Sequence, residues 1–456
     1  MRRTLIALGL ITAMFASFGC AKRGGNCADP GGTIKVGVYG DLTGQTSSFG
    51  QSTKNGSQMA ADELNAAGGI NGRQVQLIHE DDQGEPGKAA TVVAKLINQD
   101  QVRALIGEVA SSNSIAAAPN AQEGKVPMIS PSSTNPKVTQ IGDYIFRVCF
   151  IDPFQGEVMA KFAANTLKAK RAAILFDSNS DYSKGLIQFF KQSFLKLGGE
   201  IVAEQAYAQR DRDFTGQLTQ IRSANPDVIY VPGYYQEVGV IAKQTKQLGI
   251  KAPLLGGDGW DSPQLWDLGG ESLNGSFISN HYSVDDPAPV IQDFVKRYKT
   301  KFNGVAPDAL AALAYDAMMV LADAIKRANG TECVALRDAI AATNGFKGIT
   351  GVISLNAERN AVKPAVVLEL RDKQFVYKET INPDDAAPGT SPSPTATTSP
   401  TNTNTPAAAN SSPAANTSGE NTSRGNTSGG NTSGGNTSGG NTSRGNTNAG
   451  SRNMNR

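Results

Sequence analysis

Short apolar and β-branched runs alternate with amphipathic helical patterns along most of the chain. The run "TIKVGVYG" (33–40) is followed by a helical pattern at 50–68, and "RQVQLIHEDD" (73–82) is followed by another at 86–100. The same alternation resumes at "RAAILFDS" (171–178). Strands that alternate with helices in this way predict βαβ units and parallel sheets.

The alternating pattern divides into two doubly wound α/β halves, with a break near "FIDPFQG" (150–156). A long helical stretch (308–330) and the hairpin-like "VVLELRDKQFVYKE" (366–379) follow, and we expect them to return to one half and then to the other. A chain that crosses between two halves several times predicts a hinge with a cleft. Ligands of such sheets bind beyond the carboxyl ends of the strands.

Two clusters of hydroxyl side chains follow apolar runs of the first half. "GEVASSNS" (107–114) contains Ser111 and Ser112, and "SPSST" (130–134) contains Ser132 and Thr134. Hydroxyls, together with the free N–H groups at the start of a helix, are suitable donors to a carboxylate. Because both clusters follow strands, they predict one small polar ligand held between them.

The second half offers a carboxylate for a positively charged group. Asp258 in "LLGGDGWDSP" follows an apolar run and lies among glycines that let the backbone approach closely. A buried partner for an ammonium group is one interpretation of this residue. A turn-forming Asp-Gly pair is the other, and the residues alone leave both open.

Patterns typical of catalysis, phosphate binding or metal binding are missing from the sequence. There is no G-x-S-x-G, no G-x-x-x-x-G-K-[ST] and no G-x-G-x-x-G after a strand. His79 and His281 have no second ligand at metal spacing, and we interpret them as solvated or edge histidines. The formal net charge of +2 indicates no nucleic-acid surface. We expect a binding protein that is not an enzyme and has no metal, cofactor or nucleic-acid partner.

The two ends of the chain differ from the middle. "MRRTLIALGLITAMFASFGC" is typical of an export signal, and the cysteine after Gly19 resembles a lipoprotein processing site at which Cys20 becomes lipidated. Ordinary cleavage and release to the periplasm is the alternative. The other end contains repeats of "NTSGG" and too few apolar side chains to offset the entropy cost of ordering, which predicts a disordered tail.

The remaining cysteines allow more than one arrangement. With Cys20 lipidated, Cys27, Cys149 and Cys333 leave an odd number of thiols in an exported protein. Cys149 and Cys333 lie in apolar patterns typical of buried thiols. A Cys149–Cys333 bridge is an alternative that spacing does not decide.

The order of the motifs resembles the periplasmic leucine/isoleucine/valine-binding family over residues 33–378. The series begins at "VGVYGDLTGQTSSFG", continues through "GEVASS", "SPSST" and "VPGYYQEVG", and ends at "GGDGWDSPQL". The resemblance implies a type I periplasmic binding protein fold, with two Rossmann-like doubly wound lobes joined by a three-crossover hinge. It also implies the periplasmic solute-binding component of an ABC importer, which captures a branched-chain or other aliphatic amino acid for the permease subunits. The signal-like N-terminus adds the expectation of membrane attachment through a lipid anchor on Cys20. A sensor of amides or amino acids that feeds a signalling partner is the alternative.

The same resemblance implies which residues hold the charged ends of the amino acid. Ser111, Ser132 and Thr134 fall where the family grips the α-carboxylate and part of the ammonium, with Ser112 as a neighbour. Asp258 matches the acidic residue that pairs with the α-ammonium, although the best-studied members have Glu there.

The resemblance also implies the walls of the ligand site. Tyr182 and Tyr234 come from the second lobe to close over the ligand. Phe49 and Leu310 line the side-chain pocket, with plain core packing as the alternative for both. Leu310 stands where an aromatic residue is common in the family, which leaves the size of the pocket, and thus the amino acid, open.

Composition and resemblance together predict the division of the chain. The expected parts are a signal peptide at 1–20, a linker at 21–32, a first lobe at 33–151 plus 282–357, a second lobe at 152–281 plus 358–381, and the tail at 382–456.

Overall fold

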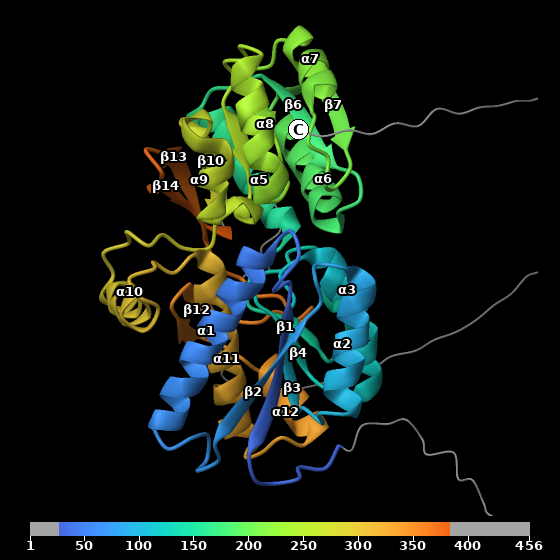
Figure 1. Ribbon diagram of the computed structural model, residues 1–456, viewed down its shortest axis with the longest axis vertical. Helices are drawn as coiled ribbons and strands as arrows, with labels where there is room; N and C mark the ends of the chain where they lie inside the picture. Colours follow the sequence, from blue (N-terminus) through green and yellow to red (C-terminus); the bar gives the residue numbers. More distant parts are fainter. Residues whose placement is uncertain (1–26, 384–456) are drawn as a thin grey trace, which may run out of the picture. The chain divides into compact units, whose positions relative to one another are not determined.

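The computed structural model describes residues 27–383. Cys20, the predicted signal and nearly all of the predicted tail lie outside this range. Within it, no helix combines the length and the apolar character that a membrane crossing requires. Two large sheets organise this part of the chain, and both are covered by helices on two faces (Figure 1).

The first sheet has five parallel strands in the order β2-β1-β3-β4-β5. Its strands are β1 Ile34–Gly40, β2 Val75–Asp81, β3 Ala104–Ile106, β4 Met128–Ser130 and β5 Ile145–Arg147. The accompanying elements are α1 Ser47–Ala66, α2 Pro86–Asn98, α3 Ser111–Gly124, α4 Lys137–Gln140, α10 Pro289–Lys301, α11 Ala309–Ala328, α12 Cys333–Ala341 and the small hairpin β11 Phe346–Gly348 and β12 Gly351–Ile353. Helices α1 and α11 cover one face, and α2 and α3 cover the other (Figure 1).

The second sheet has seven strands in the order β14-β13-β10-β9-β8-β6-β7. Five are parallel: β6 Arg171–Asp177, β7 Glu200–Tyr207, β8 Val228–Tyr230, β9 Leu254–Gly256 and β10 Ser276–Asn280. The predicted hairpin forms β13 Ala365–Arg371 and β14 Gln374–Ile381 and adds to one edge in antiparallel fashion. The accompanying helices are α5 Asp152–Lys161 with a π-helical turn Phe162–Thr166, α6 Asp181–Lys196, α7 Thr215–Ser223, α8 Tyr235–Gln247 and α9 Gln264–Gly269, with short 3₁₀ turns at Asp258–Trp260 and Gly270–Leu273.

Local sequence explains where these elements begin. The central strands β3, β8 and β9 are buried at every position, as expected for parallel strands covered on both faces. Proline occupies the first turn of α2, α5 and α10, where its missing N–H costs no hydrogen bond. The side chains of Ser180, Asp308 and Glu332 accept hydrogen bonds from the first turns of α6, α11 and α12.

The chain crosses between the lobes three times: after β5, after β10 and before β13. The predicted start of the last second-lobe segment, residue 358, is too early. Arg359 Nη2 donates to Thr139 O at 2.7 Å, and Lys363 Nζ donates to the Thr350 hydroxyl, so both residues are tied to the first lobe. These long cationic side chains are held by first-lobe acceptors, and the crossover falls between Lys363 and Ala365. The other lobe boundaries stay predictions.

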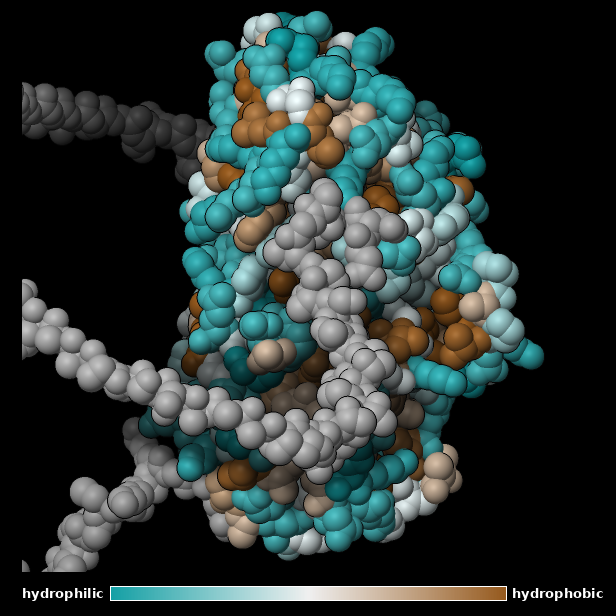
Figure 2. All heavy atoms as spheres, turned by 180° about the vertical axis from the view of Figure 1, so that it is seen from behind, coloured by the Kyte–Doolittle hydropathy of each residue, from teal (hydrophilic) through white to brown (hydrophobic). Residues whose placement is uncertain are grey.

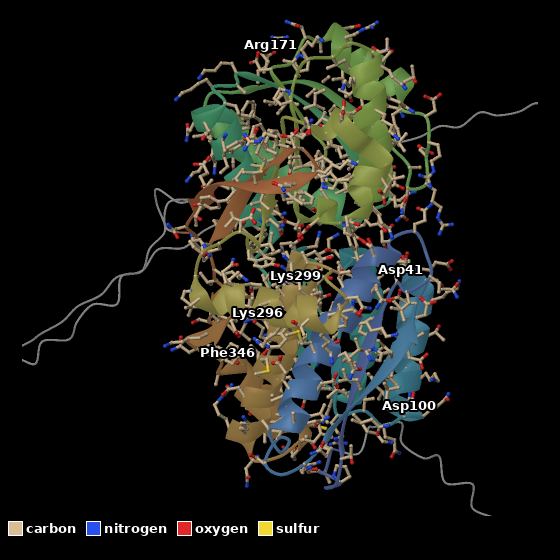
Figure 3. The ribbon with its side chains drawn as sticks, turned by 60° about the vertical axis from the view of Figure 1, so that its left-hand side comes forward. Asp41, Asp100, Arg171, Lys296, Lys299 and Phe346 are labelled. Carbon is tan, nitrogen blue, oxygen red and sulfur yellow. The ribbon has the colours of Figure 1, made fainter. Side chains whose placement is uncertain are left out.

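The carboxyl ends of both sheets face the region between the lobes. In Figure 3, Asp100, whose carbonyl accepts from Lys35 at the start of β1, lies at the far end of the first lobe, whereas Asp41, just after β1, lies next to the second lobe. Arg171, at the start of β6, lies at the opposite far end. The strand ends that carry the candidate residues therefore point toward one another.

Each lobe has its own hydrophobic core. One cluster of buried side chains fills the second lobe and extends to Phe49, Val109 and Leu310 of the first, and two others lie on the two faces of the first sheet. Helices α1 and α11 approach closely because Gly56 has no side chain: a Cβ there would lie 2.0 Å from the Ala311 carbonyl oxygen. The face seen in Figure 2 is mostly hydrophilic, with hydrophobic residues in separate small patches.

Candidate functional site

A small pocket lies between the lobes where the predicted ligand residues were expected to meet. Six of the nine predicted residues line it, together with Val109 and Gly259; the six are Phe49, Ser132, Tyr182, Tyr234, Asp258 and Leu310. They come from α1, the loop after β4, α6, the residue before α8, the turn after β9 and α11. The topology thus brings residues from six separate parts of the sequence to one place.

The Asp258 carboxylate is the charged group of this pocket. Gln155 Nε2 and Tyr182 Oη donate to its Oδ1 at 2.8 and 2.9 Å. Ser132 Oγ and His281 Nε2 lie 3.3 and 3.1 Å from its Oδ2. Ser132 belongs to the first lobe and Tyr182 to the second, so both lobes contribute donors to one buried carboxylate.

These donors keep Asp258 ionised. Burial acts to raise the pKa of Asp258, but hydrogen bonds from His281, Gln155 and Tyr182 outweigh burial, and the pKa lies below its ordinary value. Burial lowers the pKa of His281 despite its acidic neighbour. A carboxylate anion beside a neutral imidazole gives the pocket one negative charge, which favours a ligand with a positively charged group.

The glycines around Asp258 are needed for close packing. A Cβ at Gly257 would lie 2.5 Å from Tyr182 Oη, and one at Gly259 would lie 2.7 Å from the Gly233 carbonyl oxygen. The Gly259 amide donates to Tyr182 Oη at 3.1 Å. Of the two interpretations left open for Asp258, its burial and its four side-chain contacts therefore favour the buried partner over a simple turn residue.

The interpretation of His281 as a solvated or edge histidine was wrong. The residue is only 3% exposed, and its ring stacks on Phe150 at 3.8 Å between centroids. Its Nε2 contacts Asp258, and its Nδ1 has no partner among the described residues, which fits the neutral tautomer with the proton on Nε2. His281 follows β10 directly, at a crossover between the lobes, and this position at a strand end was the signal that could have identified it. Gln155 was also missed. It lies just after the first crossover, and its position at a crossover was likewise the signal that could have identified it.

Aromatic and aliphatic side chains form the remaining walls. Tyr182 and Tyr234 stack with centroids 5.2 Å apart, and Phe49 meets Tyr234 edge-on at 5.6 Å. Leu310 and Phe49 are both 1% exposed. The pocket therefore has a charged end at Asp258 and an apolar end from the first lobe.

Three predicted residues lie outside the pocket lining. Ser111 Oγ accepts from the Asn135 amide at 3.2 Å, and the Thr134 hydroxyl is buried near Asp152, whose pKa is raised to about 8, mainly by burial. Ser112 Oγ donates to Asp181 Oδ2 at 3.1 Å and accepts from the Asp181 amide at 3.0 Å, which joins the two lobes. Their role in ligand binding stays a prediction.

Several other hydroxyls of the two clusters bond to each other's loops. Ser130 Oγ and Ser133 Oγ donate to the Glu108 carbonyl oxygen at 2.7 and 2.8 Å. Ser114 Oγ and Ser133 Oγ lie 2.7 Å apart. These bonds satisfy the Glu108 carbonyl oxygen, which follows β3, and connect the two loops.

Direct contacts between the lobes surround the pocket. Ser48 Oγ lies 2.7 Å from Ser262 Oγ, Tyr235 Oη donates to the Gln45 carbonyl oxygen at 3.0 Å, and Asn135 Nδ2 donates to the Asp181 carbonyl oxygen at 2.7 Å. The free volume inside the pocket is about 10 Å³, comparable to the space for one water molecule. Any larger ligand requires the lobes to part and the side chains to adjust around it.

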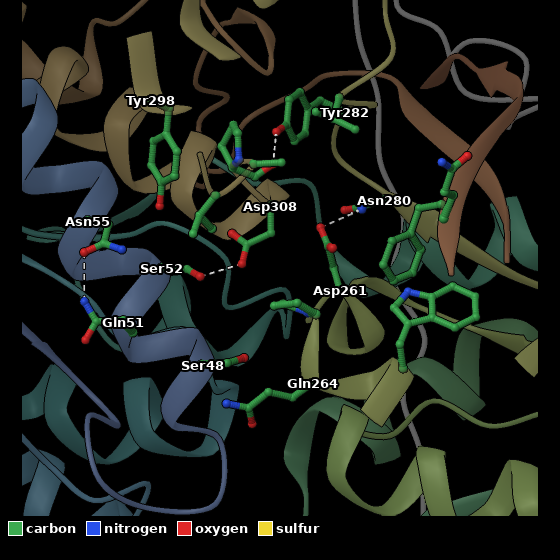
Figure 4. Close-up of a pocket in the computed structure, with 18 of the residues that line it drawn as sticks. Ser48, Gln51, Ser52, Asn55, Asp261, Gln264, Asn280, Tyr282, Tyr298 and Asp308 are labelled. Atoms are coloured by element: carbon green, nitrogen blue, oxygen red, sulfur yellow. Dashed lines mark hydrogen bonds between the residues drawn. The ribbon is translucent and has the colours of Figure 1, made fainter. Parts of the chain in front are cut away.

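A second, larger pocket of about 700 Å³ lies beside the first and contains none of the predicted residues. Figure 4 shows two of its carboxylates, Asp261 and Asp308, with protein donors already bonded to them. Asp261 Oδ2 accepts from Asn280 Nδ2 at 2.9 Å, and Asp308 Oδ2 accepts from Ser52 Oγ at 2.5 Å. Burial raises the pKa of both groups, and for Asp308 the charge of Asp261 adds to the effect and brings the pKa to about 7.

Residues 27–383 contain no group of three or more His, Cys, Asp or Glu side chains placed to hold a metal ion. The polar groups of the small pocket are hydrogen-bond donors around one anion. Such an arrangement suits reversible binding of a cation-bearing solute.

Comparisons with known proteins agree with this geometry. A family model described as periplasmic binding protein matches residues 33–374. The Leu/Ile/Val-binding protein homolog 3 of Brucella melitensis is 31% identical over 300 residues, which cover 66% of this chain and 80% of that protein. The chain is 42% identical to the leucine binding protein LivK of Thermotoga maritima, with a TM-score of 0.75, and 34% identical to the branched-chain amino acid transporter substrate binding protein LivJ of Streptococcus pneumoniae, solved with isoleucine, with a TM-score of 0.73. Each of these two matches covers 77% of this chain and all of the other.

The predicted two-lobed fold is therefore confirmed at the level of family and architecture. Solute-binding proteins of this kind are periplasmic and bind rather than convert their ligands. The chain belongs to the periplasmic binding protein family.

Proposed function

We propose that this protein captures a branched-chain or other aliphatic amino acid between its lobes and delivers it to the permease subunits of an ABC importer, without chemical turnover. The observation that carries the proposal is the ionised Asp258 in a buried pocket whose opposite wall is apolar. The relatives named for leucine, isoleucine and valine support the choice of ligand class.

Asp258 is proposed to pair with the α-ammonium group. Its carboxylate is buried, ionised and oriented by donors from both lobes. A buried anion without a cation is costly, so an ammonium ligand gains a charge-assisted hydrogen bond that water cannot replace at this site. Tyr182 and Tyr234 from the second lobe are proposed to close over the ligand.

The α-carboxylate is proposed to bind at the hydroxyl clusters, with Ser132 as the donor that already lines the pocket. Ser111 and Thr134 lie in the same two loops, and Ser112 follows Ser111 at the start of α3. Phe49 and Leu310 are proposed to enclose the aliphatic side chain. Because Leu310 is smaller than an aromatic residue, it obstructs a branched side chain less once the lobes part and the pocket widens from its free volume of about 10 Å³.

The proposal is tested by a thermal-shift screen of the purified protein against the amino acids and simple amides. A ligand that binds only the native state raises the melting temperature. We expect leucine, isoleucine or valine to give the largest shift. A matched control is 4-methylpentanoate, which is leucine without its ammonium group; we expect no shift from it at the same concentration. Equal shifts from leucine and 4-methylpentanoate, or none from any amino acid, would contradict the proposal.

We also propose that Cys20 carries a lipid anchor that holds the protein at the membrane. The support is the signal-like sequence that ends at this cysteine. Replacement Cys20→Ser should move the protein from the membrane fraction to the soluble fraction, because the acyl chains supply much of the attachment. Unchanged membrane association would contradict the anchor without affecting the ligand proposal.

A further inference from the structure

Cys27 and Cys333 lie next to each other although about 300 residues separate them in the sequence. The Cys333 amide donates to the Cys27 carbonyl oxygen at 3.1 Å. The two side chains also share a hydrogen bond, so the thiols themselves lie close together. A disulfide requires two cysteines in such close proximity, with Cα atoms about 4.4–6.8 Å apart.

Further contacts fix the segment around Cys27 against the loop before α12. Arg103 Nη2 donates to the carbonyl oxygens of Cys27 and Thr331 at 3.2 and 2.9 Å. The Thr331 amide donates to Asp29 Oδ2 at 2.7 Å, and Asp29 pairs with Arg73 at 2.8 Å. The two cysteines are therefore held in place by hydrogen bonds on both sides and do not meet by chance at a loose end.

The two thiols differ in environment. Cys333, at the first position of α12, is 5% exposed, whereas Cys27 is half-buried. Burial, and then the hydrogen bond and charge of Cys27, raise the pKa of Cys333 to about 12. Cys149, the third described cysteine, lies elsewhere in the first lobe, with its Sγ 3.4 Å from the Ser133 carbonyl oxygen. All three described cysteines are free thiols in the structure, so it does not contain the Cys149–Cys333 bridge left open by the sequence.

We propose that Cys27 and Cys333 form a disulfide in the exported protein and fasten the N-terminal segment to α12 of the first lobe. The family is periplasmic, and the periplasm is an oxidising compartment in which disulfides persist. The oxidant is a disulfide of a protein or small molecule of that compartment. The more accessible Cys27 loses its proton and attacks this disulfide, which releases one thiol. Cys333 then loses its proton and displaces the second thiol from the mixed disulfide, so two protein thiols and one external disulfide give one protein disulfide and two external thiols.

The proposed bridge lies seven residues after Cys20 in the sequence. It would fix the point at which the chain leaves the first lobe toward the proposed anchor. It would also close nearly the whole folded part of the chain into one covalent loop, and long loops constrain the unfolded state most.

Peptide mapping tests the pair directly. The full chain is isolated from the periplasm of an expression host, alkylated without reduction and digested with trypsin. We expect peptide 24–35 ("GGNCADPGGTIK") linked to peptide 328–337 ("ANGTECVALR"), with a mass two hydrogens below their sum, and an alkylated Cys149 in peptide 148–161. Separate, alkylated Cys27 and Cys333 peptides, or a link from either one to Cys149 or Cys20, would overturn the proposal.

Melting curves with and without a reductant give an independent readout. Reduction should lower the melting temperature of the wild-type protein by at least about 3 °C and leave that of Cys27→Ser unchanged. Cys149→Ala is the matched control and should respond to the reductant like the wild type. A wild-type melting temperature that stays constant while mapping shows reduced cysteines would overturn the stabilising role. Neither readout requires the amino-acid ligand, so failure here leaves the proposed function untouched.

Discussion

The two neighbouring pockets between the lobes contain similar groups but differ in electrostatics. In the small pocket, donors around Asp258 lower its pKa, and the carboxylate is ionised. In the large pocket, burial raises the pKa values of both Asp308 and Asp261; the charge of Asp261 adds to the effect at Asp308, and the charge of Asp258 adds to it at Asp261, so both acids resist ionisation. Volume alone would select the large pocket, but the small pocket has the charge that an ammonium ligand needs. The number of hydrogen-bond donors around a buried acid decides more about its role than the space beside it.

The strongest test of this difference is removal of each acid in turn. Asp258→Ala leaves the ligand's ammonium buried without a partner, and we expect a loss of at least a hundredfold in affinity, from an energetic cost of roughly 3–5 kcal/mol. Calorimetric titration with the best amino acid from the screen measures it. The matched control is Asp308→Asn, which keeps a helix-capping side chain and should change affinity less than about threefold, within what is expected for a site outside the binding pocket.

Equal losses of affinity in the Asp258 and Asp308 variants would show that ligand binding does not distinguish the two pockets. A larger loss in the Asp308 variant would assign the ligand to the large pocket. Unchanged affinity in Asp258→Ala would show that the ligand has no ammonium group, and the amino-acid proposal would then give way to an amide or organic acid.

The pH dependence of ligand affinity in His281→Phe tests the electrostatic difference between the two pockets. The phenyl ring retains stacking on Phe150 but removes one donor to Asp258, so burial should raise the pKa of Asp258. An acid with a raised pKa is protonated as pH falls, and its pairing with the ammonium is then lost. We expect wild-type affinity to be nearly constant from pH 7.5 to 5, whereas the affinity of the variant should fall over the same range as Asp258 becomes protonated.

Tyr282→Phe serves as the control for that experiment. It removes the hydroxyl that donates to the Pro307 carbonyl oxygen at 2.5 Å, beside the large pocket. A pH response of this variant equal to that of His281→Phe would show a general effect of the hinge rather than a local effect on Asp258.

A pair of serines gives a smaller, symmetrical test. Ser132 donates to Asp258 in the small pocket, and Ser52 donates to Asp308 in the large one. Ser132→Ala should weaken ligand binding about tenfold, because it removes the proposed hydrogen bond to the ligand's α-carboxylate. A hydrogen bond to a charged group contributes about 1.5 kcal/mol or more. Ser52→Ala should leave affinity unchanged. Comparable affinities for the two variants in calorimetry would remove Ser132 from the binding site.

Asp308→Asn should have the smallest effect on ligand binding. It should have a clear effect on how the free energy of unfolding changes with pH. In the wild type the folded-state pKa of about 7 exceeds the unfolded value of about 3.9, so the folded state binds more protons between these values and stability falls as pH rises through that window. The variant lacks this group and should gain about 1–4 kcal/mol relative to wild type between pH 4 and pH 8. Denaturant unfolding at both pH values measures it, and an unchanged difference would show that Asp308 ionises normally.

Much of the fold was predictable from periodicity. The apolar runs at 33–40 and 171–178 became β1 and β6, and the hairpin expected at 366–379 became β13 and β14. These patterns are local, since a strand buried on both faces must be apolar wherever it lies in the chain. The crossover near residue 358 was misplaced because the preference of Arg359 for first-lobe carbonyls depends on a partner more than two hundred residues away.

The sequence by itself determined that a carboxylate among glycines and two hydroxyl clusters follow strands, and that strand ends of two sheets carry the candidate ligand residues. Only the tertiary structure decided which hydroxyls line the pocket: Ser132 does, whereas Ser112 joins the lobes through Asp181. It also decided that His281 orients Asp258 and that Cys27 meets Cys333. The physical reason is that residue type and the succession of strands along the chain are local properties of the sequence. The partner of each polar group depends instead on three crossovers that bring distant segments within hydrogen-bonding distance.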